Sequence, residues 1–121
     1  MKRKHPERAL QAAVAEYLTW ALPAGSFFSA LPGGDGKVTR APGYVSGLPD
    51  LMVVVDGRVY FIELKSEKGR ASEAQKLVAP KILASGSYYR ICRSIEDVYE
   101  YLNFHGVQLK VRPSIKTAQA A

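Results

Sequence analysis

Residues 47–66 read GLPDLMVVVDGRVYFIELKS, and this stretch decides the fold. Leu51 to Val55 is an unbroken apolar run, which is typical of a buried strand. Asp56 and Gly57 form a hairpin turn signal, so we expect the segment 58–65 to return antiparallel to that strand. Alternation along the returning strand predicts one face with Val59, Phe61, Glu63 and Lys65, and another with Tyr60, Ile62 and Leu64.

Upstream of the hairpin, the sequence predicts a helix and a strand. Apolar residues recur at helical spacing after Pro6, which indicates an amphipathic helix from about Glu7 to Leu22. The aromatic and apolar segment 26–31 suits a strand, and a glycine-rich loop follows it.

Downstream of the hairpin, a second helix leads to a further strand. Ser72 to Gln75 fit a capping box that opens a helix to about Ala84, bent or re-set at Pro80. The segment 87–92 is expected to be a strand. Because a helix separates it from 58–65, the two strands should pair in parallel.

The carboxyl-terminal part completes the predicted fold. Ser94 is expected to cap a helix through about Leu102, and 107–111 to add a short edge strand. The order helix, three strands, helix, strand, helix predicts an α/β fold with a mixed four-stranded sheet flanked by helices. The 121 residues should form a single domain, 1–121, with a basic arm at about 1–6 and a disordered tail at about 113–121.

Charge and cysteine content narrow the class of protein. The 17 Lys and Arg residues against 11 Asp and Glu give a formal net charge of +6, which would attract nucleic acid but also serves solubility alone. Cys92 is the only cysteine, and with two histidines it cannot build a Cys/His zinc site or an intramolecular disulfide. No stretch reads as a membrane span or a signal peptide, so we expect a cytoplasmic protein without a membrane partner.

The chemically informative residues lie at one end of the hairpin. Asp50 begins one strand and Glu63 lies near the end of its partner, so their carboxylates should meet where neighbouring backbones are ~5 Å apart. Period-two geometry places Lys65 on the face of Glu63 and leaves the backbone carbonyl of Leu64 between them. The alternative is an exposed hairpin whose charged residues form only a solvated surface.

Carboxylates ~4 Å apart repel each other by a few kcal/mol, and a bound divalent cation removes this repulsion. Oxygen ligands from Asp50, Glu63 and the Leu64 carbonyl suit Mg²⁺ or Mn²⁺. Such an ion can activate water and polarise a phosphate, while Lys65 stabilises the developing negative charge. These residues therefore predict metal-dependent hydrolysis of phosphodiester bonds without a small-molecule cofactor.

The sequence closely resembles the VRR-NUC family of the PD-(D/E)XK nuclease superfamily, in its small stand-alone form. The resemblance spans about 16–102 and rests on four elements in order: Glu16 on the first helix, Gly47 to Leu51, Phe61 to Ser66, and Ser72 to Gln75. It implies a restriction-endonuclease-like core in which the metal is held by Asp50, Glu63 and the carbonyl of Leu64.

The resemblance also implies roles for Glu16 and Gln75. Glu16 would join the metal through a water or a second ion, and Gln75 would line the site beside Lys65. Without the family, Glu16 reads as a surface glutamate and Gln75 as the capping partner of Ser72, a role compatible with the first. The family further implies a DNA endonuclease of phage or prophage type, in a bacterial cell or an infected host, that acts as a homodimer on branched DNA such as four-way junctions.

Basic and aromatic residues flank the proposed site and are expected to contact DNA: Lys37, Arg40, Tyr44, Lys68, Arg70 and Lys76. Tyr44 could stack on an opened base, or it could simply cover the hydrophobic core. Three other functions stay open: a flap or single-strand nuclease, a DNA-structure-binding module that does not cut, and a restriction-type enzyme. The last is disfavoured because little chain is left for reading sequence.

Overall fold

A computed structural model of the chain describes residues 6–32 and 42–114. Its elements follow the predicted order: α1 (Pro6–Ala21), β1 (Phe27–Ala30), β2 (Leu51–Val55), β3 (Arg58–Leu64), α2 (Glu73–Ala84), β4 (Tyr88–Cys92) and α3 (Ile95–Phe104). None of these helices is long and apolar enough to cross a membrane.

The strands form one mixed sheet in the order β1-β2-β3-β4. The pairs β1–β2 and β2–β3 are antiparallel, and β4 pairs in parallel with β3, as predicted from the intervening helix. Asp56 and Gly57 have φ values of 52° and 76°, which are the left-handed conformations that a tight hairpin turn requires. The hairpin prediction is therefore confirmed, and so is the mixed four-stranded α/β architecture.

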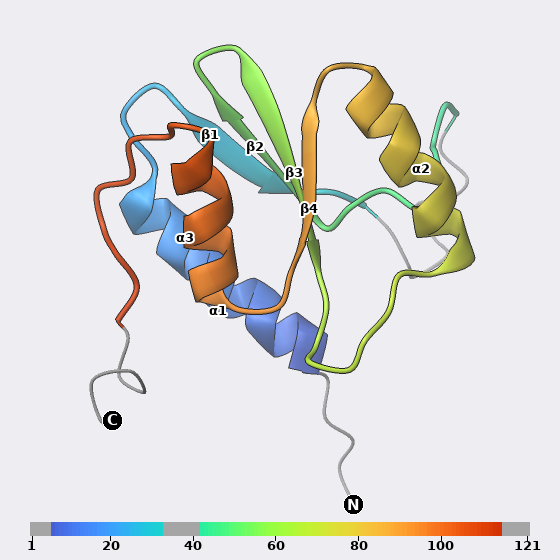
Figure 1. The fold of residues 1–121 in the computed structure, drawn as a ribbon, viewed down its shortest axis with the longest axis horizontal. Helices are drawn as coiled ribbons and strands as arrows, with labels where there is room; N and C mark the ends of the chain where they lie inside the picture. The colour runs from blue at the N-terminus through green and yellow to red at the C-terminus, as the bar shows by residue number, and fades with distance from the viewer. Residues whose placement is uncertain (1–5, 33–41, 115–121) are drawn as a thin grey trace, which may run out of the picture.

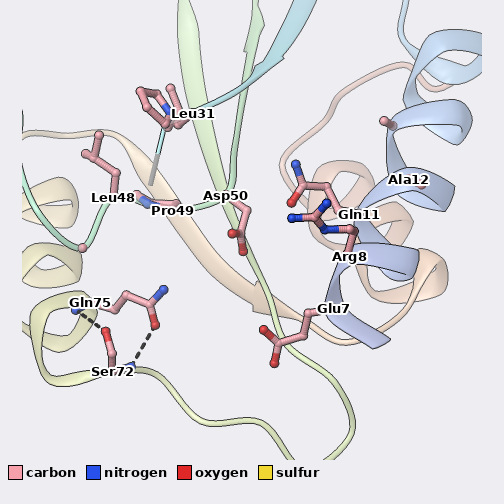
Figure 2. Close-up of a pocket in the computed structure, with 13 residues that line it drawn as sticks. Glu7, Arg8, Gln11, Ala12, Leu31, Leu48, Pro49, Asp50, Ser72 and Gln75 are labelled. Atoms are coloured by element: carbon pink, nitrogen blue, oxygen red, sulfur yellow. Dashed lines mark hydrogen bonds between the residues drawn. The ribbon is translucent and has the colours of Figure 1, made fainter. Parts of the chain in front are cut away.

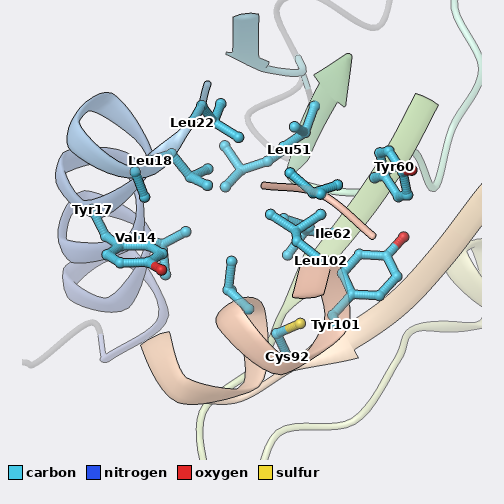
Figure 3. Packing of buried hydrophobic residues seen from close by; sticks show 14 of the residues in the cluster. Val14, Tyr17, Leu18, Leu22, Leu51, Tyr60, Ile62, Cys92, Tyr101 and Leu102 are labelled. Atoms are coloured by element: carbon cyan, nitrogen blue, oxygen red, sulfur yellow. The ribbon is translucent and has the colours of Figure 1, made fainter. Parts of the chain in front are cut away.

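Helices cover both faces of the sheet, with α1 and α3 on one side and α2 on the other (Figure 1). The core lies on the α1 and α3 side, where alternate residues of β2 and β3 point. Leu51, Ile62, Leu18 and Leu102 are each at most 1% exposed and pack in this cluster (Figure 3). The opposite face of the sheet carries Glu63. The alternation of side chains along the strand therefore places the hydrophobic core and the candidate site on different faces.

Two sequence predictions need correction. The segment 107–111 is not a strand: the Lys110 N–H donates to the carbonyl of Ala21, and the Tyr17 hydroxyl donates to the carbonyl of Val111. These bonds tie the segment to α1, whose last carbonyls have no partners within the helix. Helix α2 is also not re-set at Pro80, since it continues as a single helix from Glu73 to Ala84.

Candidate active site

Asp50 is positioned by the register of the hairpin. Leu51, the first residue of β2, pairs with Ile62, so Asp50 immediately before β2 lies level with Glu63 on β3. The Asp50 side chain is fixed there because its Oδ2 accepts a hydrogen bond of 2.7 Å from the backbone N–H of Leu64. The acidic pair predicted from the sequence therefore meets at one end of the hairpin.

Glu63 is buried although it is acidic. Only 1% of the residue is exposed, and its Oε2 accepts a hydrogen bond of 2.6 Å from Gln75 Nε2 and lies 3.6 Å from Lys65 Nζ. Its other oxygen, Oε1, has no hydrogen-bond partner among the residues that the structure describes. Buried polar atoms are normally satisfied, so this oxygen is expected to have a partner other than the described protein groups.

The electrostatics of the site agree with this geometry. Burial and, next, the negative charge of Asp50 raise the pKa of Glu63 to about 8, although the Lys65 ammonium acts in the opposite direction. Burial also raises the pKa of Tyr89 to about 12, with the charges of Glu63 and Asp50 as the next causes. At neutral pH the acidic pair therefore holds a proton, or else needs a cation in its place.

The donor set fits a hard divalent cation. The two carboxylates, one of which carries the unpartnered Oε1, offer the oxygen ligands that Mg²⁺ or Mn²⁺ prefers, and the backbone of Leu64 lies beside Asp50. In the part of the chain that is described, no group of three or more Asp, Glu, His or Cys side chains is placed to hold a metal.

Helix α1 presents Glu7 to the site, and not the predicted Glu16. The two residues are nine positions apart, about two and a half helical turns, so their side chains point to opposite sides of the helix. Glu16 is exposed, whereas Glu7 lies on the same stripe as the buried Val14 and Leu18. The spacing of Glu7 from these core residues is the sequence signal that could have identified it.

The turn that follows Lys65 holds the carboxylate of Glu7. Glu7 Oε2 accepts a hydrogen bond of 3.2 Å from the backbone N–H of Ser66. Arg93 Nη1 fixes the same turn from the other side, donating to the carbonyls of Ser66 at 2.6 Å and Gly69 at 2.8 Å. Sequence reasoning assigned no role to Arg93, because its partners are 24 and 27 residues away.

Gln75 performs two functions at once. Its Oε1 accepts from the backbone N–H of Ser72 in a capping box, while its Nε2 donates to Glu63. The loop before Asp50 approaches the same helix end closely, since a Cβ atom on Gly47 would lie 2.4 Å from the carbonyl oxygen of Ala74. These contacts hold the amino-terminal end of α2 next to Asp50 and Glu63.

A cavity of about 680 Å³ opens beside these groups. Figure 2 shows Asp50 at its centre, with Glu7 below, Gln75 on the α2 side, and Arg8 and Gln11 on the α1 side. Glu16 is not among the lining residues. The volume lies in the range of about 300–1,000 Å³ that is usual for small-ligand sites.

Two solved structures share this architecture. One, described as "VRR_NUC domain", aligns over 85% of this chain and 99% of its own with a TM-score of 0.59 and 22% identity. The other, "VRR_NUC domain protein", aligns over 84% of this chain and 91% of its own with a TM-score of 0.67 and 21% identity. The chain has the VRR_NUC fold. No protein-family model and no curated protein matches the sequence.

In this VRR_NUC fold, the predicted DNA contacts that the structure describes differ in exposure. Lys68, Arg70 and Lys76 are exposed, and Lys76 lies 3.4 Å from Glu73. Tyr44 is half-buried and does not line the cavity. The other two predicted contacts, Lys37 and Arg40, lie outside the described residues.

Proposed function

We propose that this protein belongs to the VRR-NUC family and is a metal-dependent endonuclease that hydrolyses phosphodiester bonds of DNA. The observation that carries the proposal is the acidic pair of half-buried Asp50 and buried Glu63: Glu63 Oε1 has no hydrogen-bond partner among the described residues, and Lys65 Nζ lies 3.6 Å from Glu63 Oε2. The shared fold and the net charge of +6 support it.

Each side chain has a separate part in this chemistry. Asp50, Glu63 and the Leu64 carbonyl would hold Mg²⁺ or Mn²⁺, which supplies an activated water and a Lewis acid for the scissile phosphate. Lys65 orients the attacking water and stabilises the negative charge that develops on the phosphate. Gln75 keeps Glu63 in place through its amide.

The substrate we propose is branched DNA such as four-way junctions, cut by a homodimer. A two-fold dimer presents two identical sites to two strands related by symmetry, which one small site cannot reach alone. The exposed residues Lys68, Arg70 and Lys76 would contact phosphates beside the cut strand. We place the protein in the cytoplasm of a bacterial or phage-infected cell.

The proposal is tested by cleavage of a four-way junction, a flap, a single strand and a linear duplex in Mg²⁺ or Mn²⁺. We expect junction cleavage that EDTA abolishes. Lys65→Ala should slow cutting by roughly 10²- to 10³-fold, the usual effect of removing one group that stabilises transition-state charge, and leave DNA affinity nearly unchanged. Lys81→Ala removes an exposed lysine from the far part of α2 and is the matched control.

Equal cutting by Lys65→Ala and the unaltered protein would assign the activity to another site or to a contaminant. Tight binding of junctions without cleavage by the unaltered protein in either metal would instead identify a DNA-structure-binding module.

A further inference from the structure

The cavity beside Asp50 has two chemically different walls. Arg8, Gln11, Ala12 and Ala15 follow one another at positions i, i+3, i+4 and i+7, so they form one stripe of α1. The facing wall is apolar and comprises Leu31, Pro32, Leu48 and Pro49. The two alanines leave the space between the walls open, and the carboxylates of Asp50 and Glu7 also line the cavity.

The α1 wall offers hydrogen-bond donors that the described residues do not use. Among the residues that the structure describes, no carboxylate lies within ion-pair distance of Arg8, and neither Arg8 nor Gln11 makes a side-chain hydrogen bond. Their side chains lie next to each other and face Asp50 across the cavity (Figure 2). A guanidinium and an amide with free donors are suited to a phosphate group.

We infer that this cavity binds one unpaired nucleotide of the DNA strand, with its phosphate on Arg8 and Gln11 and its sugar and base against Leu48 and Pro49. This inference rests on the proposed nuclease function and names the feature of the substrate that the site selects. The adjoining phosphate of the same strand then reaches the acidic pair. Arg8 and Gln11 are substrate-binding residues in this arrangement, and they take no part in the bond-breaking step.

The size of the cavity explains why the nucleotide must be unpaired. A volume of about 680 Å³ is that of a small-ligand site, so we expect it to take a single nucleotide and not a stack of base pairs. Taking a nucleotide out of a duplex costs a few kcal/mol, and this cost is least where the base is already unpaired. The cavity therefore favours DNA that has an unpaired position beside the cleaved bond, as a branch point provides.

Binding measurements test the phosphate contact. The probes are a fluorescein-labelled duplex with one unpaired thymidine and the same duplex without it, titrated in Ca²⁺ and followed by anisotropy, with intact DNA confirmed on a gel. Arg8→Ala should weaken binding of the first probe by about 10- to 100-fold, the effect of losing one charged hydrogen-bonding group. Arg58→Ala, which removes an exposed arginine at the β2–β3 turn, should weaken both probes equally and by only a few fold.

A steric pair of variants tests the cavity without changing charge. Ala12→Phe fills the space between the walls and should remove the preference for the unpaired probe, whereas Ala13→Phe, on an exposed neighbouring position outside the cavity, should keep it. Equal binding of both probes by the unaltered protein overturns the inference. So does an Ala12→Phe variant that retains the preference, or an Arg8→Ala variant that behaves as Arg58→Ala does.

The inference and the proposed function fail separately, because binding is measured without cleavage. A protein that cuts junctions but binds both probes equally refutes the nucleotide site alone. A protein that prefers the unpaired probe but never cuts in Mg²⁺ or Mn²⁺ refutes the nuclease function alone.

Discussion

Replacing Glu63 with glutamine tests the acidic pair directly, through stability and without any substrate. The side chain is 1% exposed, and its Oε1 has no partner in the described part of the chain. Glu63→Gln keeps the shape, keeps an acceptor for Gln75, and gives the orphaned position an N–H group that Asp50 can accept. We expect the variant to be more stable than the unaltered protein at alkaline pH.

The magnitude follows from the pKa of Glu63, which burial and then the charge of Asp50 raise from 4.5 to about 8. The folded protein keeps this proton up to about pH 8, while the unfolded chain releases it near 4.5. Unfolding therefore releases a proton between these two pH values, and the free energy of unfolding falls as pH rises through this window. At 1.36 kcal/mol per pH unit the loss is at most about 5 kcal/mol, and we expect a few kcal/mol.

Thermal unfolding in EDTA at pH values from 5 to 9 measures this effect. Near pH 5 the two proteins should have similar melting temperatures, and at pH 9 Glu63→Gln should melt higher by on the order of 10 °C. Glu73→Gln is the matched control, because that side chain is 91% exposed and its replacement should leave the pH dependence unchanged. Parallel curves for Glu63→Gln and the unaltered protein across the whole range would refute the assignment of a buried, proton-holding Glu63.

Two further predictions concern the loop before Asp50 and the cation. Gly47→Ala should destabilise the protein by about 3 kcal/mol or more, since Gly47 has a φ of +91° and the new Cβ would lie 2.4 Å from the Ala74 carbonyl oxygen. Gly57→Ala, with a φ of +76° and nothing within 4 Å of the new Cβ, should lose only about 1 to 2 kcal/mol; equal losses in urea unfolding would mean that the close approach is no constraint. Affinity for Mn²⁺, measured by calorimetry, should rise up to tenfold per pH unit between pH 6 and 8, because the ion must displace the Glu63 proton. A pH-independent affinity in this range would place the ion elsewhere.

The hairpin was predictable from the sequence because its signals are local. An apolar run, an Asp-Gly turn and strict alternation fix the register, and the register alone brings Asp50 level with Glu63. The segment 107–111 was predicted wrongly for the opposite reason. Its apolar residues indicated burial, but whether they pair with a strand or pack on the end of α1 depends on Tyr17 and Ala21, which are distant in sequence.

The same distinction applies to the candidate site. Glu63 and Lys65 lie on one strand two residues apart, so the pleat settles their relation. The choice between Glu7 and Glu16 depends on how α1 is rotated about its axis relative to the sheet. That rotation is set by which helical face packs on the core, so an acidic residue on the first helix could be expected but not assigned without the stripe formed by Val14 and Leu18.

The stability of the metal-free protein and its nuclease activity should depend on pH in opposite directions, because both depend on the protonation of Glu63. Between about pH 4.5 and 8 the metal-free fold loses stability, because the folded protein keeps a proton on Glu63 that the unfolded chain releases; above about pH 8 the fold carries the charges of Glu63 and Asp50 side by side. The same ionisation prepares the pair for a cation, so under the proposed function cutting rises with pH up to about 8 while the metal-free protein weakens. If Glu63 had only a structural role, the amide of Glu63→Gln would avoid the unfavourable ionisation beside Asp50. A bound cation explains why a carboxylate stands there instead, because the cation compensates its charge.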